Sequence, residues 1–244
     1  MRKVILHYHL FKNAGTSLDT AFKANFGQDK WATNEFPGNK NLNAEQLTRW
    51  IESHPEINCF SSHSAFLPVP QLKDSLVLPV IFVRHPIDRI MSAYSFESKQ
   101  ISESFGAVLA RNTTLGGYIE TRLSMPHDTQ CRNFQSNRFA MMYPDSDGSE
   151  LSRATATLDA LPFCGIVETY QESLNRLTTW LKEEGFTDIK LKLSAQNVSR
   201  SASLSIEEKL AKLKQDIGPE LYEHLLKVNA DDLAFYQHAC QVWK

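Results

Sequence analysis

Val4-Ile-Leu-His-Tyr-His-Leu-Phe-Lys-Asn-Ala-Gly-Thr-Ser17 is the stretch that decides the fold. It begins as an apolar run, breaks at Lys12 and Gly15, and continues with apolar residues at helical spacing from Leu18 to Phe26. This pattern predicts a strand, a tight loop and a helix. Such a loop directs backbone N–H groups and a helix N-terminus at one point, which suits a phosphate or a sulfate group.

The order of residues in this loop differs from the two commonest phosphate-binding motifs. In G-x-x-x-x-G-K-[ST] the lysine follows the glycines, whereas Lys12 precedes Gly15, and G-x-G-x-x-G is absent. We expect Lys12 to reach an anionic oxygen and Gly15 to let the backbone approach the anion closely. The alternative is a simple helix cap beside a solvated lysine. The other expected donors of the loop are Asn13, Ala14, Thr16 and Ser17.

A second segment, Leu78–Val83 followed by Arg84-His-Pro-Ile-Asp-Arg-Ile-Met-Ser-Ala-Tyr94, has a similar organisation. The apolar run fits a strand buried on both faces, and the proline favours a helix start, with Asp88 as the expected cap. Arg84 would then lie at the carboxyl end of a strand, where open α/β sheets bind ligands, and Ser92 in the following helix. We expect Arg84 and Ser92 to grip a second phosphate; the alternative is an arginine paired with a neighbouring carboxylate.

Together the two segments resemble those of the sulfotransferases that use 3′-phosphoadenosine 5′-phosphosulfate (PAPS). Residues 12–17 are similar to the K-x-x-[GS]-[TS]-[ST] loop that holds the 5′-phosphosulfate there. Residues 84–94 are similar to the R-[DHN]-P-x-x-R-x-x-S-x-Y segment that holds the 3′-phosphate, although His85 stands where many members have Asp. The residues in and around both segments look most like those of the carbohydrate branch of this family, which includes heparan-sulfate 2-O-sulfotransferase-like enzymes and bacterial relatives.

The resemblance implies a single sulfotransferase domain over residues 1–244 that transfers a sulfuryl group from PAPS, as co-substrate, to an acceptor hydroxyl. It favours a saccharide as acceptor and requires no metal, since lysine and arginine supply the positive charge. Two other classes stay open, a P-loop kinase that uses ATP and a non-catalytic nucleotide-binding module. The position of Lys12 before Gly15 argues against the kinase, and the presence of both a lysine and a candidate base argues against the module.

Several residues are candidates for roles in such a transfer. We expect Lys12 to stabilise the bridging oxygen of the leaving phosphate. His63 follows a predicted strand end, and its ordinary pKa of about 6.5 suits proton removal at neutral pH. Glu35 is the second candidate for the base, because other family members use a glutamate. Arg200 lies in a polar loop that covers the nucleotide in the family, and Arg138 lies in a stretch similar to N-x-Q-[ST]-R with one extra residue, which leaves its role open.

Strand and helix patterns alternate along the chain, which predicts an α/β fold. The resemblance implies a P-loop-like, three-layer form of it, with a central parallel sheet flanked by helices. We expect further strands at 57–62, 163–167 and 190–193, a short helix at 44–53 within a polar segment, and a helical tail at 205–243 broken at 218–219. The helical region 88–140 is expected to break at 116–117 and 126.

Composition narrows the class of protein further. The 244 residues are 42% hydrophobic, enough for one substantial core, and a net charge of −2 gives no sign of a nucleic-acid binder. The four cysteines show neither a zinc-ligand spacing nor a disulfide framework, and a hydrogen bond near the loop is favoured over metal binding for His7 and His9. Because no apolar run reaches membrane-spanning length and the first strand follows Met1 directly, we expect a cytoplasmic, bacterial enzyme.

Overall fold

A computed structural model describes residues 1–192 and 204–243 of the chain. In this part of the chain the strands form one sheet of order β2-β3-β1-β4-β5 with parallel pairing throughout. The central strands are β1 (Arg2–Tyr8) and β4 (Ser75–Val83). The sheet is completed by β3 (Cys59–Ser62), β2 (Trp31–Thr33) and β5 (Gly165–Ile166).

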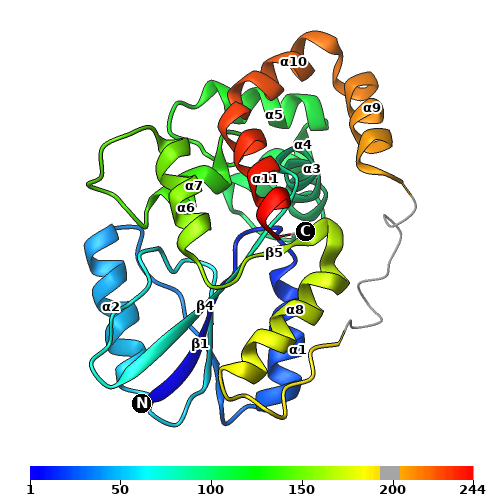
Figure 1. The fold of residues 1–244 in the computed structure, drawn as a ribbon. Helices are drawn as coiled ribbons and strands as arrows, with labels where there is room; N and C mark the ends of the chain where they lie inside the picture. Colours follow the sequence, from blue (N-terminus) through cyan, green and yellow to red (C-terminus); the bar gives the residue numbers. More distant parts are fainter. Residues whose placement is uncertain (193–203, 244) are drawn as a thin grey trace.

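Helices cover both faces of this sheet (Figure 1). Val4, Leu6 and Tyr8 of β1 point into one apolar cluster, whereas Ile5 points into another, so both faces of the strand are buried. The first cluster is covered by α2 (Lys40–Glu52), α6 (Phe134–Ala140), α7 (Glu150–Ala160) and α11 (Ala230–Trp243). The second is covered by α1 (Gly15–Phe26) and α8 (Tyr170–Glu183). The predicted α/β fold with a central parallel sheet between helical layers is therefore confirmed.

A third apolar cluster lies beyond the sheet, among the helices in the upper part of Figure 1. It joins residues far apart in the sequence, for example Ile87 and Ile90 with Leu213 and Leu225. This packing places the C-terminal helices beside the segment that follows β4. The helices are α3 (Pro86–Glu97), α4 (Phe105–Asn112), α5 (Leu115–Ser124), α9 (Ile206–Ile217) and α10 (Pro219–Val228).

Three predictions of local structure are wrong, each for a visible reason. The break predicted at Gly116 and Gly117 lies instead at 113–114, because both glycines belong to the first turn of α5, where the Thr114 hydroxyl accepts the Gly117 N–H at 3.2 Å. Residues 190–192 form no strand, because the Asn25 side chain binds the N–H and C=O of Lys190 at 2.7 and 3.0 Å. Asp88 does not cap α3, since its carboxylate instead binds Arg84.

Other predictions hold with adjusted limits. The tail breaks at Gly218 and Pro219, the helix that follows β5 ends before Gly185, and the helical region breaks near Pro126. The polar segment 28–56 also contains the short strand β2, which the sequence did not reveal. No helix in residues 1–192 or 204–243 combines the length and the apolar character that crossing a lipid bilayer requires.

Candidate functional site

The loop between β1 and α1 contains left-handed backbone and leads directly into a helix. Lys12 and Ala14 adopt positive φ angles of 65° and 62°, and Ala14 directly precedes the first residue of α1. The N–H groups of Gly15 and Thr16 lie in the first helical turn, where helix geometry offers them no acceptor. The loop can therefore present backbone donors to a negatively charged group.

Asn13 is the loop residue for which the structure corrects the prediction. It is 2% exposed, and its N–H donates to the Leu10 carbonyl at 3.1 Å. Its side-chain amide donates to the Phe82 carbonyl at 2.8 Å and to Gln135 Oε1 at 2.9 Å. Asn13 is therefore an anchor that ties the loop to β4 and α6, because these donors are already used inside the protein.

Gly15 is required for a reason that the sequence did not show. A Cβ atom at this position would overlap the imidazole ring of His9. The close approach that glycine allows is therefore made to a histidine of the same chain. It brings the anion loop into direct contact with a cluster of polar side chains.

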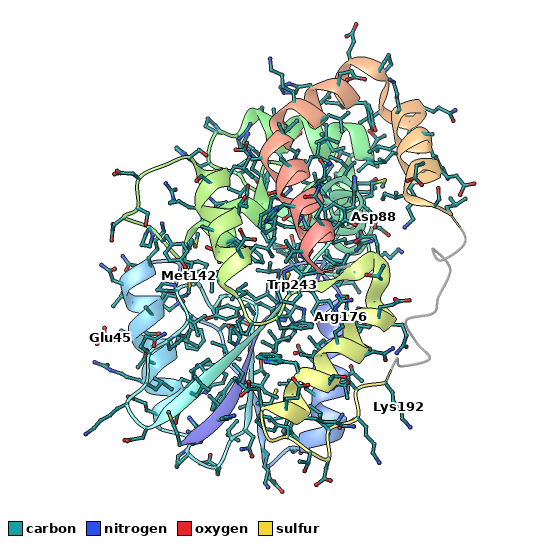
Figure 2. The ribbon with its side chains drawn as sticks, in the orientation of Figure 1. Glu45, Asp88, Met142, Arg176, Lys192 and Trp243 are labelled. Carbon is teal, nitrogen blue, oxygen red and sulfur yellow. The ribbon has the colours of Figure 1, made fainter. Side chains whose placement is uncertain are left out.

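Arg84 connects the two predicted grips. Its Nη1 donates to the Lys12 carbonyl at 2.9 Å, and its Nε and Nη2 lie 2.8 and 2.6 Å from Asp88 Oδ2. An arginine has five N–H donors, so two are left over from these three contacts. The alternative that paired Arg84 with a nearby carboxylate is thus correct, but the arginine also fixes the loop. Figure 2 shows Asp88 in the upper half of the molecule, far from Glu45 on α2.

A basic groove runs along one side of α3. It consists of two hollows of about 290 and 480 Å³ that share Ser92 and Ser95 as lining residues. Lys12 and Lys99 line the smaller hollow. The larger one is lined by Arg84, Lys209 and Lys212, together with the carboxylates of Asp88 and Asp216. The structure therefore brings Lys12, Arg84 and Ser92 together as predicted, and α9 adds two lysines.

The sequence did not indicate that Lys209 and Lys212 belong to the candidate site. Both lie on one side of an amphipathic helix, a pattern that is typical of a solvated face. In the structure the ammonium of Lys209 lies 3.2 Å from Asp88 Oδ1, so one carboxylate holds both Arg84 and Lys209. No local signal could have shown that α9 packs against α3.

The Lys12 side chain is itself held in place. Its ammonium lies 4.2 Å from the centre of the Phe96 ring, a distance typical of a cation–π contact. Burial, together with the charges of Arg84 and Lys99, lowers the pKa of Lys12 from its ordinary value. Each of these causes disfavours the charged form, so an anion in the groove would relieve part of the cost of keeping Lys12 protonated.

A polar cluster lies at the carboxyl ends of β1 and β3, beside the loop. Asp19 accepts hydrogen bonds from Nδ1 of His7 and Nδ1 of His9, both at 2.7 Å, and from the Ser61 hydroxyl at 2.6 Å. Burial opposes ionisation, yet these hydrogen bonds hold the pKa of the Asp19 carboxyl well below its usual range. The predicted hydrogen bond of a histidine near the loop is thus confirmed.

His63 and Glu35, the two candidates for the base, lie side by side at the rim of this cluster. The His63 backbone N–H donates to Glu35 Oε1 at 3.2 Å, and the His63 side chain is exposed. The centre of its ring lies 3.7 Å from that of His9. Partial burial and the neighbouring His9 lower the pKa of His63, against the opposing charges of Glu35 and Asp19.

Two predicted arginines have different outcomes. Arg138 stacks on aromatic rings, with its guanidinium carbon 4.7 Å from the centre of Phe66 and 5.5 Å from that of Phe134. In the same stretch Gln135 accepts the Arg84 N–H at 2.9 Å and donates to the Arg84 carbonyl at 2.8 Å, so it holds the end of β4 in place. Arg200 lies outside the described residues.

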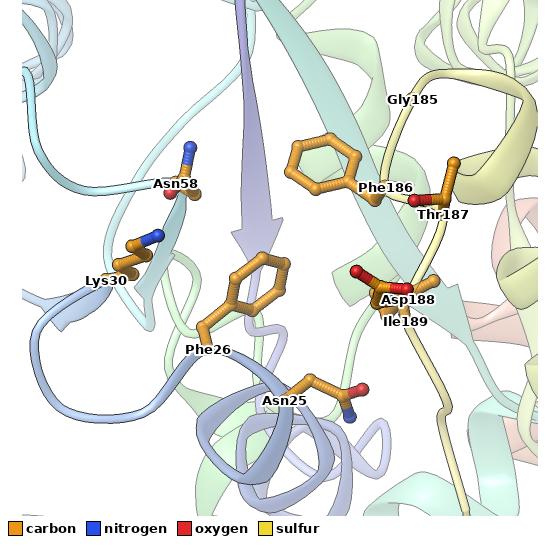
Figure 3. A pocket seen from close by; sticks show the side chains of 9 residues that line it. All are labelled: Asn25, Phe26, Lys30, Asn58, Gly185, Phe186, Thr187, Asp188 and Ile189. Carbon is orange, nitrogen blue, oxygen red and sulfur yellow. The ribbon is translucent and has the colours of Figure 1, made fainter.

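A separate hollow of about 480 Å³ lies at the other end of the sheet (Figure 3). Its lining residues include Lys30 and Asn58, which precede β2 and β3, and Phe186, which faces Phe26 of α1. Among the predicted site residues that the structure describes, none lines it. Because parallel sheets bind ligands at the carboxyl ends of their strands, the groove along α3 is the better candidate site.

Comparison with known proteins identifies the family to which the chain is similar. A family model described as "Sulfotransferase family" matches residues 1–239. An uncharacterized protein of Archaeoglobus fulgidus is 34% identical over 253 residues, which cover 100% of this chain and 98% of that protein. The matched ranges span the loop after β1, the segment after β4 and the histidine cluster.

Proposed function

Since the chain belongs to the sulfotransferase family, we propose that it transfers the sulfuryl group of PAPS to an acceptor hydroxyl, preferably on a saccharide. The basic groove along α3 is the observation that supports PAPS as the sulfuryl donor. Its cations lie in two groups, Lys12 and Lys99 in one hollow and Arg84 with two lysines of α9 in the other. A nucleotide with phosphate groups at both ends of its ribose needs two cationic binding sites. The second site lets the protein bind this nucleotide in preference to nucleotides that carry phosphate at one end only.

The residues of the loop would act on the leaving side of the reaction. PAPS supplies the sulfuryl group, which leaves the 5′-phosphate as the S–O bond breaks and a bond to the acceptor oxygen forms. Lys12 would neutralise the charge that develops on the leaving oxygen, and the N–H groups of Gly15 and Thr16 would hold the 5′-phosphate. Positioning and charge stabilisation provide most of the catalysis in the related transfer of phosphoryl groups.

The histidine cluster would act on the acceptor side. His63 would take the proton of the acceptor hydroxyl, because its ring is exposed and its lowered pKa keeps it neutral at neutral pH. Glu35 stays the second candidate, since it contacts the backbone of the same residue. In this proposal Arg84 and Ser92 bind the 3′-phosphate, Thr16 and Ser17 supply hydroxyl donors, and Arg200 covers the nucleotide.

The same proposal includes four further points. The chain forms a single sulfotransferase domain over residues 1–244 and belongs to the heparan-sulfate 2-O-sulfotransferase-like branch. It needs no metal for catalysis, and it acts in the cytoplasm of a bacterium. A screen of glycans and small alcohols with PAPS, read out by product mass, tests the acceptor. Transfer to lipid or peptide hydroxyl groups and none to saccharides would overturn that preference.

Binding experiments separate the competing functions. We expect adenosine 3′,5′-bisphosphate to raise the melting temperature more than adenosine 5′-monophosphate or ATP with Mg²⁺ does. A preference for ATP with Mg²⁺ would favour the kinase. Binding of the bisphosphate with no transfer to any acceptor in the panel would favour the non-catalytic module.

A further inference from the structure

Three imidazole rings form a row from the interior to the surface. The rings of His7 and His9 are stacked with centres 5.2 Å apart, and the centre of the His63 ring lies 3.7 Å from that of His9 with planes tilted by 40°. His7 and His9 are 1% and 6% exposed, whereas His63 is exposed. Solvent and an acceptor can therefore reach the outer ring, while the inner two are enclosed by protein.

Asp19 contacts the same nitrogen, Nδ1, of each inner ring. Each of its oxygens accepts one Nδ1–H, from His7 and His9, and an ionised carboxylate can only accept. His9 therefore carries its proton on Nδ1. Burial lowers the pKa of His9 from its ordinary value, against the opposing effect of the hydrogen bond that His9 donates to Asp19, and this favours a neutral ring at pH 7.

His9 has two neighbours that matter for the reaction. On one side its ring packs against the Cα of Gly15, in the loop proposed to hold the 5′-phosphate. On another side it packs against the ring of His63. The position of His63 relative to the loop is therefore transmitted through His9, and the position of His9 is set by Asp19.

We propose that Asp19 and His9 are positioning residues that hold His63 as the proton acceptor of the transfer. This inference rests on the proposed function. As His63 takes the proton of the acceptor hydroxyl, the acceptor oxygen bonds to sulfur, and the leaving phosphate keeps the electron pair of the broken S–O bond. The positive charge that forms on His63 is then stabilised by two carboxylates, Glu35 beside it and Asp19 behind a neutral His9.

The test measures the titration of His63 in two variants by NMR of its ring carbon. In Asp19→Asn the loss of a negative charge should lower the pKa of His63 by about 0.5–1 unit. In His9→Asn, which keeps an N–H donor for Asp19 but removes the ring, greater access of water should raise it. The charged and titratable groups facing His63 are His9, Glu35 and Asp19, and only Glu35 stays unchanged across both variants.

Activity provides the second readout. The acid limb of kcat/KM should move with the pKa of His63 in each variant, and kcat should fall by about 10-fold or more. In Asp19→Asn the affinity for adenosine 3′,5′-bisphosphate should stay within about 2-fold of the wild type, since Asp19 does not line the basic groove. Asp29→Asn is the matched control, because Asp29 is exposed and the same charge is removed.

A folded Asp19→Asn protein with an unchanged His63 titration and acid limb would overturn the proposal and leave the cluster a purely structural one. Should Asp19→Asn not fold, an unchanged titration in His9→Asn has the same consequence. The NMR titration needs no turnover, so it is distinct from the test of the proposed function. That function fails if the wild-type protein transfers no sulfuryl group from PAPS.

Discussion

Replacing Arg84 by alanine is expected to weaken the binding of adenosine 3′,5′-bisphosphate far more than that of adenosine 5′-monophosphate. Three of its donors are occupied by Lys12 and Asp88, which leaves two N–H groups for the 3′-phosphate. A hydrogen bond to a charged group contributes about 1.5–3 kcal/mol. Because the groove is open to water, we count one such contribution, which corresponds to a roughly 10- to 150-fold rise in Kd.

The ratio of the two affinities is the informative quantity. Arg84 also holds the Lys12 carbonyl, so its loss can loosen the loop and weaken both nucleotides together. Only a missing contact to the 3′-phosphate changes their ratio. Isothermal titration calorimetry at one fixed salt concentration measures both constants, and salt must be fixed because screening changes these interactions.

A matched control exists on α2. Arg49 forms an i,i+4 pair with Glu45, as Arg84 does with Asp88, but lies on an exposed helix face. Arg49→Ala should leave both affinities unchanged. If Arg84→Ala weakens the two nucleotides equally, the arginine acts only through the loop, and if it weakens neither, the second grip has been assigned to the wrong residue.

Three further expectations concern the loop and the base. Lys12→Ala should lower turnover by at least ~10²-fold in a sulfuryl-transfer assay. Lys227→Ala is the control, because Lys227 is exposed. Near-normal turnover in Lys12→Ala would show that Lys12 takes no part in the chemistry. His63→Ala should also cost at least ~10²-fold. Because the active form of this base is neutral and its pKa is lowered, wild-type activity should persist below pH 6.5 and fall only as the pH drops through the lowered value; a fall at or above pH 6.5 would contradict this. Gly15→Ala should lower the free energy of unfolding by about 1–3 kcal/mol, since the new methyl group overlaps the His9 ring, and an unchanged denaturant midpoint would contradict the packing.

The strand-loop-helix units were predictable because their signals are local. An apolar run followed by Lys12, Gly15 and a helical pattern specifies the loop wherever the rest of the chain lies. The same holds for Arg84 after the apolar run of β4. In a parallel sheet both segments must end at the same edge, so their meeting was also within reach of the sequence.

The side chains that anchor the loop and the partners of the charged site residues were harder to predict, because most of them are contacts between distant segments. Asn13 looked like a ligand of the anion, yet it binds Gln135, which is 122 residues away. Asp88 looked like a helix cap. Its pair with Arg84 was the alternative that the sequence offered, whereas its contact with Lys209 on α9 depends on how distant helices pack. Residue type and spacing do not report such long-range choices.

By itself the sequence determined the α/β alternation, the loop between the first strand and helix, the arginine after β4 and the histidine after β3, since each follows from patterns within about a dozen residues. The tertiary structure alone decided that α9 brings two lysines to the groove and that Asp19 aligns His7 and His9 beneath His63. The physical reason is that backbone preferences are local, whereas the partner of a buried or charged side chain is chosen by whichever distant segment packs against it.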